Sequence, residues 1–293
     1  MNILVIGNGF DLAHGLPTRY DDFLTFVDEY RNKLISEKVF ENEQKQIDEH
    51  SFDVLHYILE KKEKLIQIEC LLSLENIREL KEELITDLNR LIRCLEVYLD
   101  DYVRKSFFNE LKKLKYIEAI NIDKLLTFNY TNTYEYIYGK SNINFDYIHG
   151  RADVGHDLNS CNLVLGIDEY LDENEKNTNT EFIQFKKFFQ RIYKGTGCLY
   201  KDWIKFYTEQ KVKLHKLRHE LNLYFIGHSL DVTDKDILKE LILYDGANTT
   251  IYYHNQEALG RMIANLVKVI GEDELISRTG GSKATIKFVQ QPD

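Results

Sequence analysis

The chain opens with four consecutive apolar residues that run directly into a turn spaced by glycines. The apolar run is Ile3–Ile6, and Gly7 and Gly9 flank Asn8 immediately after it. A buried parallel strand that ends at such a turn can bring its backbone close to a phosphate group, because glycine tolerates a tight approach and a positive φ. Asn-Gly is also a common hairpin turn. A helical pattern follows, with Thr18 as its expected N-cap, and this favours a nucleotide-binding loop over a hairpin.

Glycine and proline are distributed unevenly along the chain. There is no glycine between Gly15 and Gly139, and no proline between Pro17 and Pro292. The strongest helix breakers are therefore missing from most of the first half, where apolar residues recur at helical spacing. We expect residues 31–116 to form a helical insertion whose apolar stripe packs internally or contacts a partner or a second copy of the chain.

The remainder alternates short apolar runs with polar clusters and helices. The expected strands are Lys124–Phe128, Ile143–Ile148, Leu163–Leu165, Asn222–Ile226 and Thr249–His254, with Lys283–Val289 as a candidate edge strand. A helix is expected at Gln256–Ile270, and the aromatic stripe of a second helix at Phe182–Tyr193 is expected in the core. This alternation predicts an α/β fold with a parallel, doubly wound sheet, formed by residues 1–30 and 117–293.

Polar clusters follow four of these strands, at Gly7–Asp11, Asn129, His149 and Gly227–Ser229. In a doubly wound sheet, ligands bind beyond the carboxyl ends of the strands. We therefore expect the four clusters to share one edge of the sheet and to form a site for a nucleotide-like small molecule.

Charge and cysteine content restrict the partners. The chain has 38 basic and 48 acidic residues, a formal net charge of −10, which argues against a broad surface for nucleic acid or anionic membrane but leaves room for a local basic patch. No apolar run approaches the ~18 residues of a membrane span, and the first strand leaves no room for a signal peptide, so a cytoplasmic location is expected. Cys70, Cys94, Cys161 and Cys198 include no C-x-x-C pair, so we expect reduced, mostly buried thiols.

Several short motifs resemble those of sirtuin-like NAD-binding domains. They are GNGFDL at Gly7–Leu12, TFNYT at Thr127–Thr131, IHG at Ile148–Gly150 and GHSLDVTD at Gly227–Asp234. The opening IGNGFDLAHGLPTRYDDF at Ile6–Phe23 resembles the bacteriophage abortive-infection family AbiH. These resemblances imply a sirtuin-like Rossmann-type sheet with a large helical insertion, a role in antiviral defence and, by analogy with related defence domains, hydrolysis of NAD.

The resemblance also implies roles for individual residues. Asn129 matches the asparagine beside the nicotinamide ribose, and His149 matches the catalytic histidine. Both types suit cleavage through an oxocarbenium-like state, because histidine titrates near neutrality and an amide both donates and accepts hydrogen bonds. The expected binding residues are Gly7 and Gly9 at the pyrophosphate, Gly227 and Ser229 at the adenosine half, and Asn8, Phe10, Asp11, Thr131, Asn132 and His228.

The sequence departs from the sirtuin pattern at three points. Thr131 stands where sirtuins have an aspartate, and Asp11 and Asn132 are the candidates to replace it. Phe10 and Asp11 would make the mouth of the pocket bulkier and more acidic. The two cysteine pairs of a zinc-dependent deacylase are missing, so that activity is rejected and no metal is expected.

Each candidate also has a structural interpretation. Asn129 is a candidate cap for a helix at Thr131–Tyr138, His149 is a candidate turn histidine bonded to backbone, and His228 is a candidate structural residue. Asp231, Asp234 and Asp236 could form a metal cluster, but acidic residues are favoured at a helix start and we expect capping.

Three functions are compatible with these observations. The sequence favours an NAD glycohydrolase that releases nicotinamide. One alternative is a catalytically silent sensor of NAD or a nucleotide derivative that signals through the helical insertion to a defence partner or second copy. The other is a metal-dependent nuclease that uses the aspartates.

Overall fold

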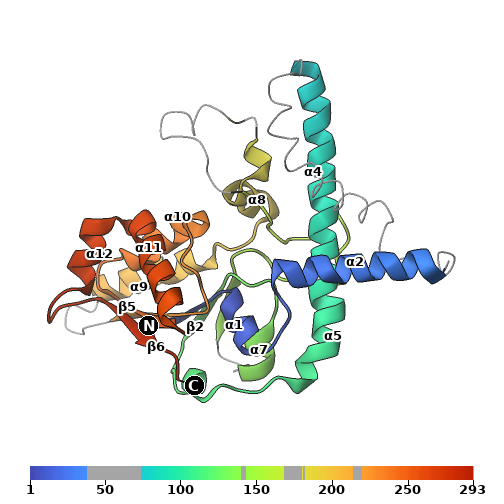
Figure 1. Cartoon of the computed structure of the whole chain (residues 1–293). Helices are drawn as coiled ribbons and strands as arrows, with labels where there is room; N and C mark the ends of the chain where they lie inside the picture. The colour runs from blue at the N-terminus through green and yellow to red at the C-terminus, as the bar shows by residue number, and fades with distance from the viewer. Residues whose placement is uncertain (38–73, 140–142, 168–179, 181, 214–219, 293) are drawn as a thin grey trace.

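A computed structural model describes residues 1–37, 74–139, 143–167, 180, 182–213 and 220–292 (Figure 1). Its centre is a six-stranded sheet in the order β3-β2-β1-β4-β5-β6, in which every neighbouring pair is parallel. The strands are β1 (Asn2–Ile6), β2 (Lys124–Thr127), β3 (Asn144–Tyr147), β4 (Leu221–Ile226), β5 (Ala247–Tyr253) and β6 (Ile286–Gln290). This order is that of dinucleotide-binding folds, with the direction of winding reversing between β1 and β4. The expected parallel, doubly wound α/β sheet is confirmed.

The helices follow the strands in the alternating manner expected. They are α1 (Asn8–Ala13), α2 (Tyr20–Glu37), α4 (Leu74–Val97), α5 (Arg104–Phe107), α6 (Lys115–Glu118), α7 (Thr133–Tyr138), α8 (Lys187–Lys194), α9 (Leu199–Lys213), α10 (Lys235–Ile242), α11 (Gln256–Ile270) and α12 (Glu272–Thr279). A π-helical turn, η1 (Tyr98–Val103), joins α4 to α5, and short 3₁₀ turns lie at η2 (Phe108–Glu110), η3 (Ile183–Phe185) and η4 (Val232–Asp234). The helix expected at Gln256–Ile270 is confirmed.

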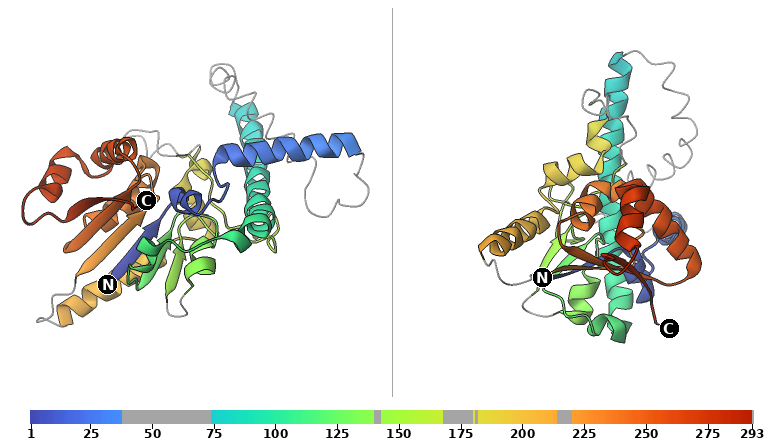
Figure 2. Two further views of the ribbon diagram at one scale, coloured as in Figure 1. Left: turned by 60° about the horizontal axis from the view of Figure 1, so that its bottom comes forward. Right: turned by 90° about the vertical axis from the view of Figure 1, so that its left-hand side faces the viewer.

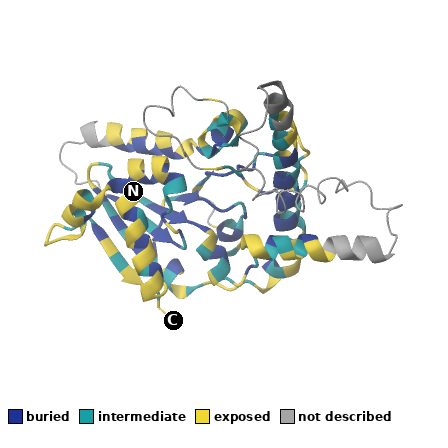
Figure 3. Cartoon of the chain, turned by 45° about the horizontal axis from the view of Figure 1, so that its top comes forward, coloured by how far each residue is buried: buried dark blue, intermediate teal, exposed yellow. Residues whose placement is uncertain are grey.

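Successive residues of β1 belong to two different layers of the core. Ile3 and Val5 pack with α9 and α10 on one side of the sheet, whereas Leu4 and Ile6 pack with α6 and α7 on the other. Side chains alternate along a strand, so a central strand covered on both sides must be apolar throughout. Figure 3 shows these buried strands at the centre and exposed outer faces on the surrounding helices.

A third apolar cluster joins α2, α4 and η1 to the segment that follows β3. Figures 1 and 2 show α2 crossing α4 at a steep angle, at the end of the molecule opposite to β5, β6 and α12. Phe23 and Tyr98 lie in this cluster together with Ala152 and Leu163. The Tyr98 hydroxyl donates to the carbonyl oxygen of Pro17 at 2.7 Å. The described part of the expected helical insertion is thus helical and packs against the sheet domain, whereas residues 38–73, including Cys70, lie outside the described residues.

Two local expectations are wrong. Leu163–Leu165 is not a strand, because the backbone N–H and C=O of Leu165 each bond the side-chain amide of Gln190, both at 3.0 Å, instead of a neighbouring strand. Thr18 does not cap α2, which begins at Tyr20. Asp22 accepts a hydrogen bond from the backbone N–H of Arg19 at 2.8 Å and so supplies the cap.

The aromatic stripe of α8 does not lie in the core. Phe188 is 40% exposed and Tyr193 is 80% exposed, whereas Gln190 and Arg191 are buried. The inner side of α8 faces the backbone of Leu165 and acidic side chains of the η4–α10 segment, so polar residues face inward. The expectation of an aromatic core here is therefore wrong.

The state of the cysteines and the apolar character of the helices are also predicted from the sequence. Cys94 and Cys161 are buried free thiols and Cys198 is an exposed one, so the expected pattern holds for two of the three described cysteines. Among the described helices, none combines the length and apolar character needed to cross a bilayer.

Candidate active site

The loops that follow β1 and β4 touch where the winding of the sheet reverses. Gly9 donates its backbone N–H to the carbonyl oxygen of Gly227 at 2.8 Å, and Gly7 donates to that of Ile226 at 3.3 Å. Gly227 has φ +65°, and a Cβ there would lie 2.0 Å from the Phe10 nitrogen. The glycines therefore allow two backbones to cross in contact, and the amides of Gly7 and Gly9 bind protein carbonyls in this structure.

Three expected binding residues near these loops lie outside the buried site. Asn8 is exposed, and its side chain accepts a hydrogen bond from Thr18 at 2.7 Å. Phe10 is fully buried and packs against the rings of Tyr134 and Tyr138, which places it in the core rather than at the mouth of a pocket. Ser229 is exposed, and its carbonyl oxygen accepts from Asn265.

Asp11 points from α1 towards the loop that follows β2. The Thr131 hydroxyl donates to its Oδ2 at 2.5 Å, and the Thr133 hydroxyl donates to that of Thr131 at 3.0 Å. Oδ1 of Asp11 is buried without a hydrogen-bond partner among the described residues. Burial raises the pKa of Asp11 to about 6, against the smaller opposing effects of Thr131, Thr133 and Asn129.

Asn129 lies next to this carboxyl group. It is near enough to lower the pKa of Asp11 slightly, yet neither of its buried side-chain amide atoms forms a regular hydrogen bond with a described residue. It does not cap α7, whose N-cap is Asn132, a partly buried residue that makes no side-chain cap bond. The structure thus brings Asp11, Asn129 and Thr131 together as one buried polar group.

A second buried group surrounds Asp234, at the start of α10. Oδ1 of Asp234 lies 3.2 Å from Nε2 of His149 and 3.1 Å from Nζ of Lys187. Oδ2 lies 3.8 Å from Nε2 of His228. Burial alone would raise the pKa of Asp234, but His149, Lys187 and His228 together hold it well below its usual range. The carboxylate therefore stays ionised while buried.

His149 is held in place by its backbone neighbourhood. Its Nδ1 lies 3.3 Å from the carbonyl oxygen of Phe128, which only accepts, so this nitrogen carries the proton. Nε2 lies 3.2 Å from Oδ1 of Asp234 without forming a hydrogen bond, and it has no other partner among the described side chains. Burial lowers the pKa of His149 although Asp234 opposes this. The prediction that His149 bonds the backbone is thus confirmed for Nδ1 only, because Nε2 is left as a basic nitrogen without a hydrogen bond.

His228 is fixed in a single neutral form. Its Nδ1 accepts the backbone N–H of Leu230 at 2.9 Å, so the proton lies on Nε2. Burial lowers the pKa of His228 to about 4. Leu230 has φ +57°, an uncommon value for a branched side chain, in the sharp bend that holds His228 over Asp234.

Sequence reasoning missed Lys187 and the central position of Asp234. Asp231 is a cap, as expected, since its side chain accepts from the backbone of Thr233. Asp234 instead pairs with Lys187, and Asp236 pairs with Arg191. Among the described residues no group of three or more His, Cys, Asp or Glu is arranged to hold a metal ion. The spacing of the GHSLDVTD motif could have indicated that Asp234 lies close to His228. Lys187 could not have been found in this way, because it comes from a helix with no matching motif.

The arrangement can perform acid–base chemistry at the carboxyl edge of the sheet. It combines a neutral imidazole beside an ionised carboxylate, a buried carboxyl whose pKa lies near 6, and an unbonded amide. These are the groups of a general base and of an anchor for hydroxyl groups. No curated protein matches the chain. The family model described as bacteriophage abortive infection AbiH matches residues 3–254, and the chain therefore belongs to the AbiH family.

Proposed function

We propose that this protein acts in phage abortive infection as a cytoplasmic NAD glycohydrolase, releasing nicotinamide at the edge of a sirtuin-like sheet. Membership of the AbiH family supports the defence role. The strand order supports a dinucleotide ligand, because folds of this order bind such ligands where the winding reverses.

The observation that carries the proposal is the set of buried atoms without a partner among the described residues, namely the side-chain amide of Asn129 and Oδ1 of Asp11. Leaving a buried donor or acceptor without a partner costs about 1–3 kcal/mol, so such groups point to a ligand that completes them. The hydroxyls of a ribose both donate and accept, which matches an amide beside a carboxyl. Asn129 and Asp11 would therefore hold the ribose next to nicotinamide.

His149 would act as the general base. Its free Nε2 accepts a proton from water, and the water oxygen forms a bond to the anomeric carbon of the ribose. The bond to nicotinamide breaks with its electron pair going to the ring nitrogen, so nicotinamide leaves neutral. The imidazolium formed then pairs with Asp234, whose Oδ1 is 3.2 Å away.

Substrate entry requires a movement, because Asp11, Asn129 and His149 are all buried. The segment after β3 covers the edge through three hydrogen bonds: Ala152 N–H to the Tyr130 carbonyl, Val164 N–H to the His149 carbonyl, and the Tyr130 hydroxyl to the Val164 carbonyl. Each is 2.8 Å long. We infer that a ligand enters by displacing these bonds.

The alternatives predict other outcomes. A silent sensor would bind NAD without turnover through the same residues. The nuclease is less well supported, because Asp234 and Asp236 already pair with Lys187 and Arg191, and Asp231 serves as a cap.

The test is incubation of purified protein with NAD and measurement of nicotinamide. Asn129→Ala and His149→Ala should each lower turnover by ~10²-fold or more at a nearly unchanged melting temperature, because a positioned general base contributes 10²–10⁴ in rate. His254→Ala, at an exposed histidine, is the matched control and should keep full activity. Binding of NAD without nicotinamide would support the sensor, and full activity in both site variants would refute the catalytic assignment.

A further inference from the structure

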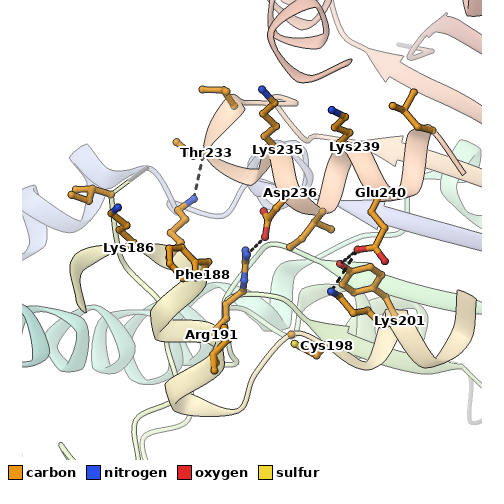
Figure 4. A pocket seen from close by; sticks show the side chains of 18 of the residues that line it. Lys186, Phe188, Arg191, Cys198, Lys201, Thr233, Lys235, Asp236, Lys239 and Glu240 are labelled. Atoms are coloured by element: carbon orange, nitrogen blue, oxygen red, sulfur yellow. Dashed lines mark hydrogen bonds and ion pairs between the residues drawn. The ribbon is translucent and has the colours of Figure 1, made fainter. Parts of the chain in front are cut away.

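A large open groove lies between α8 and α10, beside the candidate active site, with which it shares Lys187. Its volume is about 1190 Å³, and residues at the start of α9 also line it. Figure 4 shows Arg191 of α8 meeting Asp236 of α10 across it, and Lys201 approaching Glu240. Pockets for drug-sized ligands have about 300–1,000 Å³, so this groove admits a larger or longer molecule.

The charge of the groove is opposite to that of the chain. Six basic side chains line it, from Lys186, Lys187, Arg191, Lys201, Lys235 and Lys239, against two acidic ones, from Asp236 and Glu240. The chain as a whole has a formal charge of −10. A local excess of cations in an acidic protein attracts anions to that place alone.

The cations of α10 are the most available. Lys235 and Lys239 are exposed, lie one helical turn apart and extend from the same side of α10, pointing away from Arg191 at the rim of the groove (Figure 4). Neither forms an ion pair with another described residue. Arg191 and Lys201 are engaged with the two acidic side chains, so Lys235 and Lys239 are the cations left to bind an external anion.

Apolar side chains share the groove with these cations. Phe188 is 40% exposed and Ile192 is 73% exposed, both on α8. Grooves that bind single-stranded nucleic acid combine basic side chains along the phosphates with exposed rings on which bases stack. Duplex DNA is instead read by elements that project into its grooves, so a concave surface favours a single strand.

We propose that this groove binds a short single-stranded nucleic acid, with Lys235 and Lys239 at the phosphates and Phe188 beneath a base. Lys187 lines the same groove while bonding Asp234, which lies against His149. A strand in the groove would thus be connected to the candidate catalytic histidine through two side chains, Lys187 and Asp234.

The test is fluorescence anisotropy with a labelled oligothymidylate of about 12 nucleotides, within the usual site size of such grooves. The Lys235→Ala/Lys239→Ala protein should bind at least about tenfold more weakly than wild type, with a smaller dependence on salt. The control is Lys283→Ala/Lys287→Ala, which removes two exposed lysines outside the groove and should leave binding unchanged. Melting temperatures of both proteins establish that they are folded.

Further measurements distinguish a single strand from other ligands, and this proposal from the proposed glycohydrolase activity. Phe188→Ala should weaken binding of the strand, and a duplex of the same length should bind more weakly than the strand. Equal displacement by ATP or NAD at matched phosphate concentration would overturn the assignment to a strand, as would wild-type protein that does not bind it. Binding is measured without turnover and should persist in His149→Ala, so failure of the glycohydrolase proposal would leave this result intact.

Discussion

At the scale of single residues, burial drives most titratable groups at the sheet edge towards their neutral forms. The pKa of Asp11 is raised, whereas those of His149 and His228 are lowered, because the charged form loses solvation in each case. Asp234 is the exception, since His149, Lys187 and His228 together outweigh its burial. A charged acid and a neutral base therefore stand side by side, which suits proton transfer at neutral pH.

Asp11 should make the stability of the protein dependent on pH. Its folded pKa of about 6 lies above the ordinary aspartate value of 3.8, so the folded state binds more protons between these values. The stability contributed by protonated Asp11 is thus fully present below the lower pKa and is lost as pH rises through the upper one. Wild type should therefore lose roughly 3 kcal/mol in free energy of unfolding between about pH 4 and about pH 7, whereas Asp11→Asn should not show this loss.

Urea denaturation of both proteins across this range measures the difference. Asp28→Asn, at an exposed position of α2, is the control for replacing an aspartate by an asparagine. A difference between Asp11→Asn and wild type that is independent of pH would contradict the assigned shift.

At the scale of elements, the site depends on how closely neighbouring loops approach. The loops after β1 and β4 are in backbone contact through Gly9 and Gly227, and this contact sets the positions of α1 and His228. α8 faces inward with polar side chains because it meets backbone and carboxylates there, and this brings Lys187 to Asp234. Both features depend on neighbours distant in sequence.

Replacing Gly227 tests the loop crossing. Gly227→Ala should lower the free energy of unfolding by at least about 3 kcal/mol, because it combines a left-handed φ with a Cβ 2.0 Å from the Phe10 nitrogen. Gly260→Ala is the matched control, since Gly260 lies within α11 with nothing within 4 Å of its added Cβ. It should raise stability by up to about 1 kcal/mol through helix propensity. Equal effects of the two substitutions in chemical denaturation would show that the crossing carries no constraint.

At the scale of the whole molecule, α4 is joined to the segment that covers the candidate site. Glu96 of α4 is fully buried and accepts hydrogen bonds from Arg93 at 2.5 Å and from the backbone of Asp153 at 3.2 Å. His156 lies 2.6 Å from the same carboxylate. Any movement of α4 would therefore also displace the segment that covers the candidate site. Whether the helical insertion also contacts a partner or a second copy stays a prediction, to be measured by light scattering.

Glu96→Gln should test this connection. It should destabilise the protein by about 3 kcal/mol, because it leaves Arg93 beside an uncharged buried group. Asp101→Asn removes an exposed ion pair with Lys105 and should cost no more than about 1 kcal/mol. Thermal and urea unfolding of both variants gives the comparison, and a cost for Glu96→Gln as small as that of the control would refute the connecting role.

The sequence by itself determined the sheet and which polar clusters follow its strands. Runs such as Ile3–Ile6 are apolar throughout because a central parallel strand is covered on both sides. This pattern is local and can therefore be recognised from the sequence. The carboxyl ends of parallel strands then share an edge by geometry alone, which placed Asn129, His149 and His228 near one another.

Only the tertiary structure decided which atoms in that cluster are satisfied and which are left unpaired. Lys187 reaches Asp234 from a helix with no recognisable motif, and Gln190 takes the place of a strand at Leu165. The same packing buried Phe10 and exposed the aromatic face of α8, against the sequence pattern. Burial and pairing depend on contacts between residues far apart in the chain, so no local pattern encodes them, and the pKa shifts that make the site chemically useful follow from those contacts.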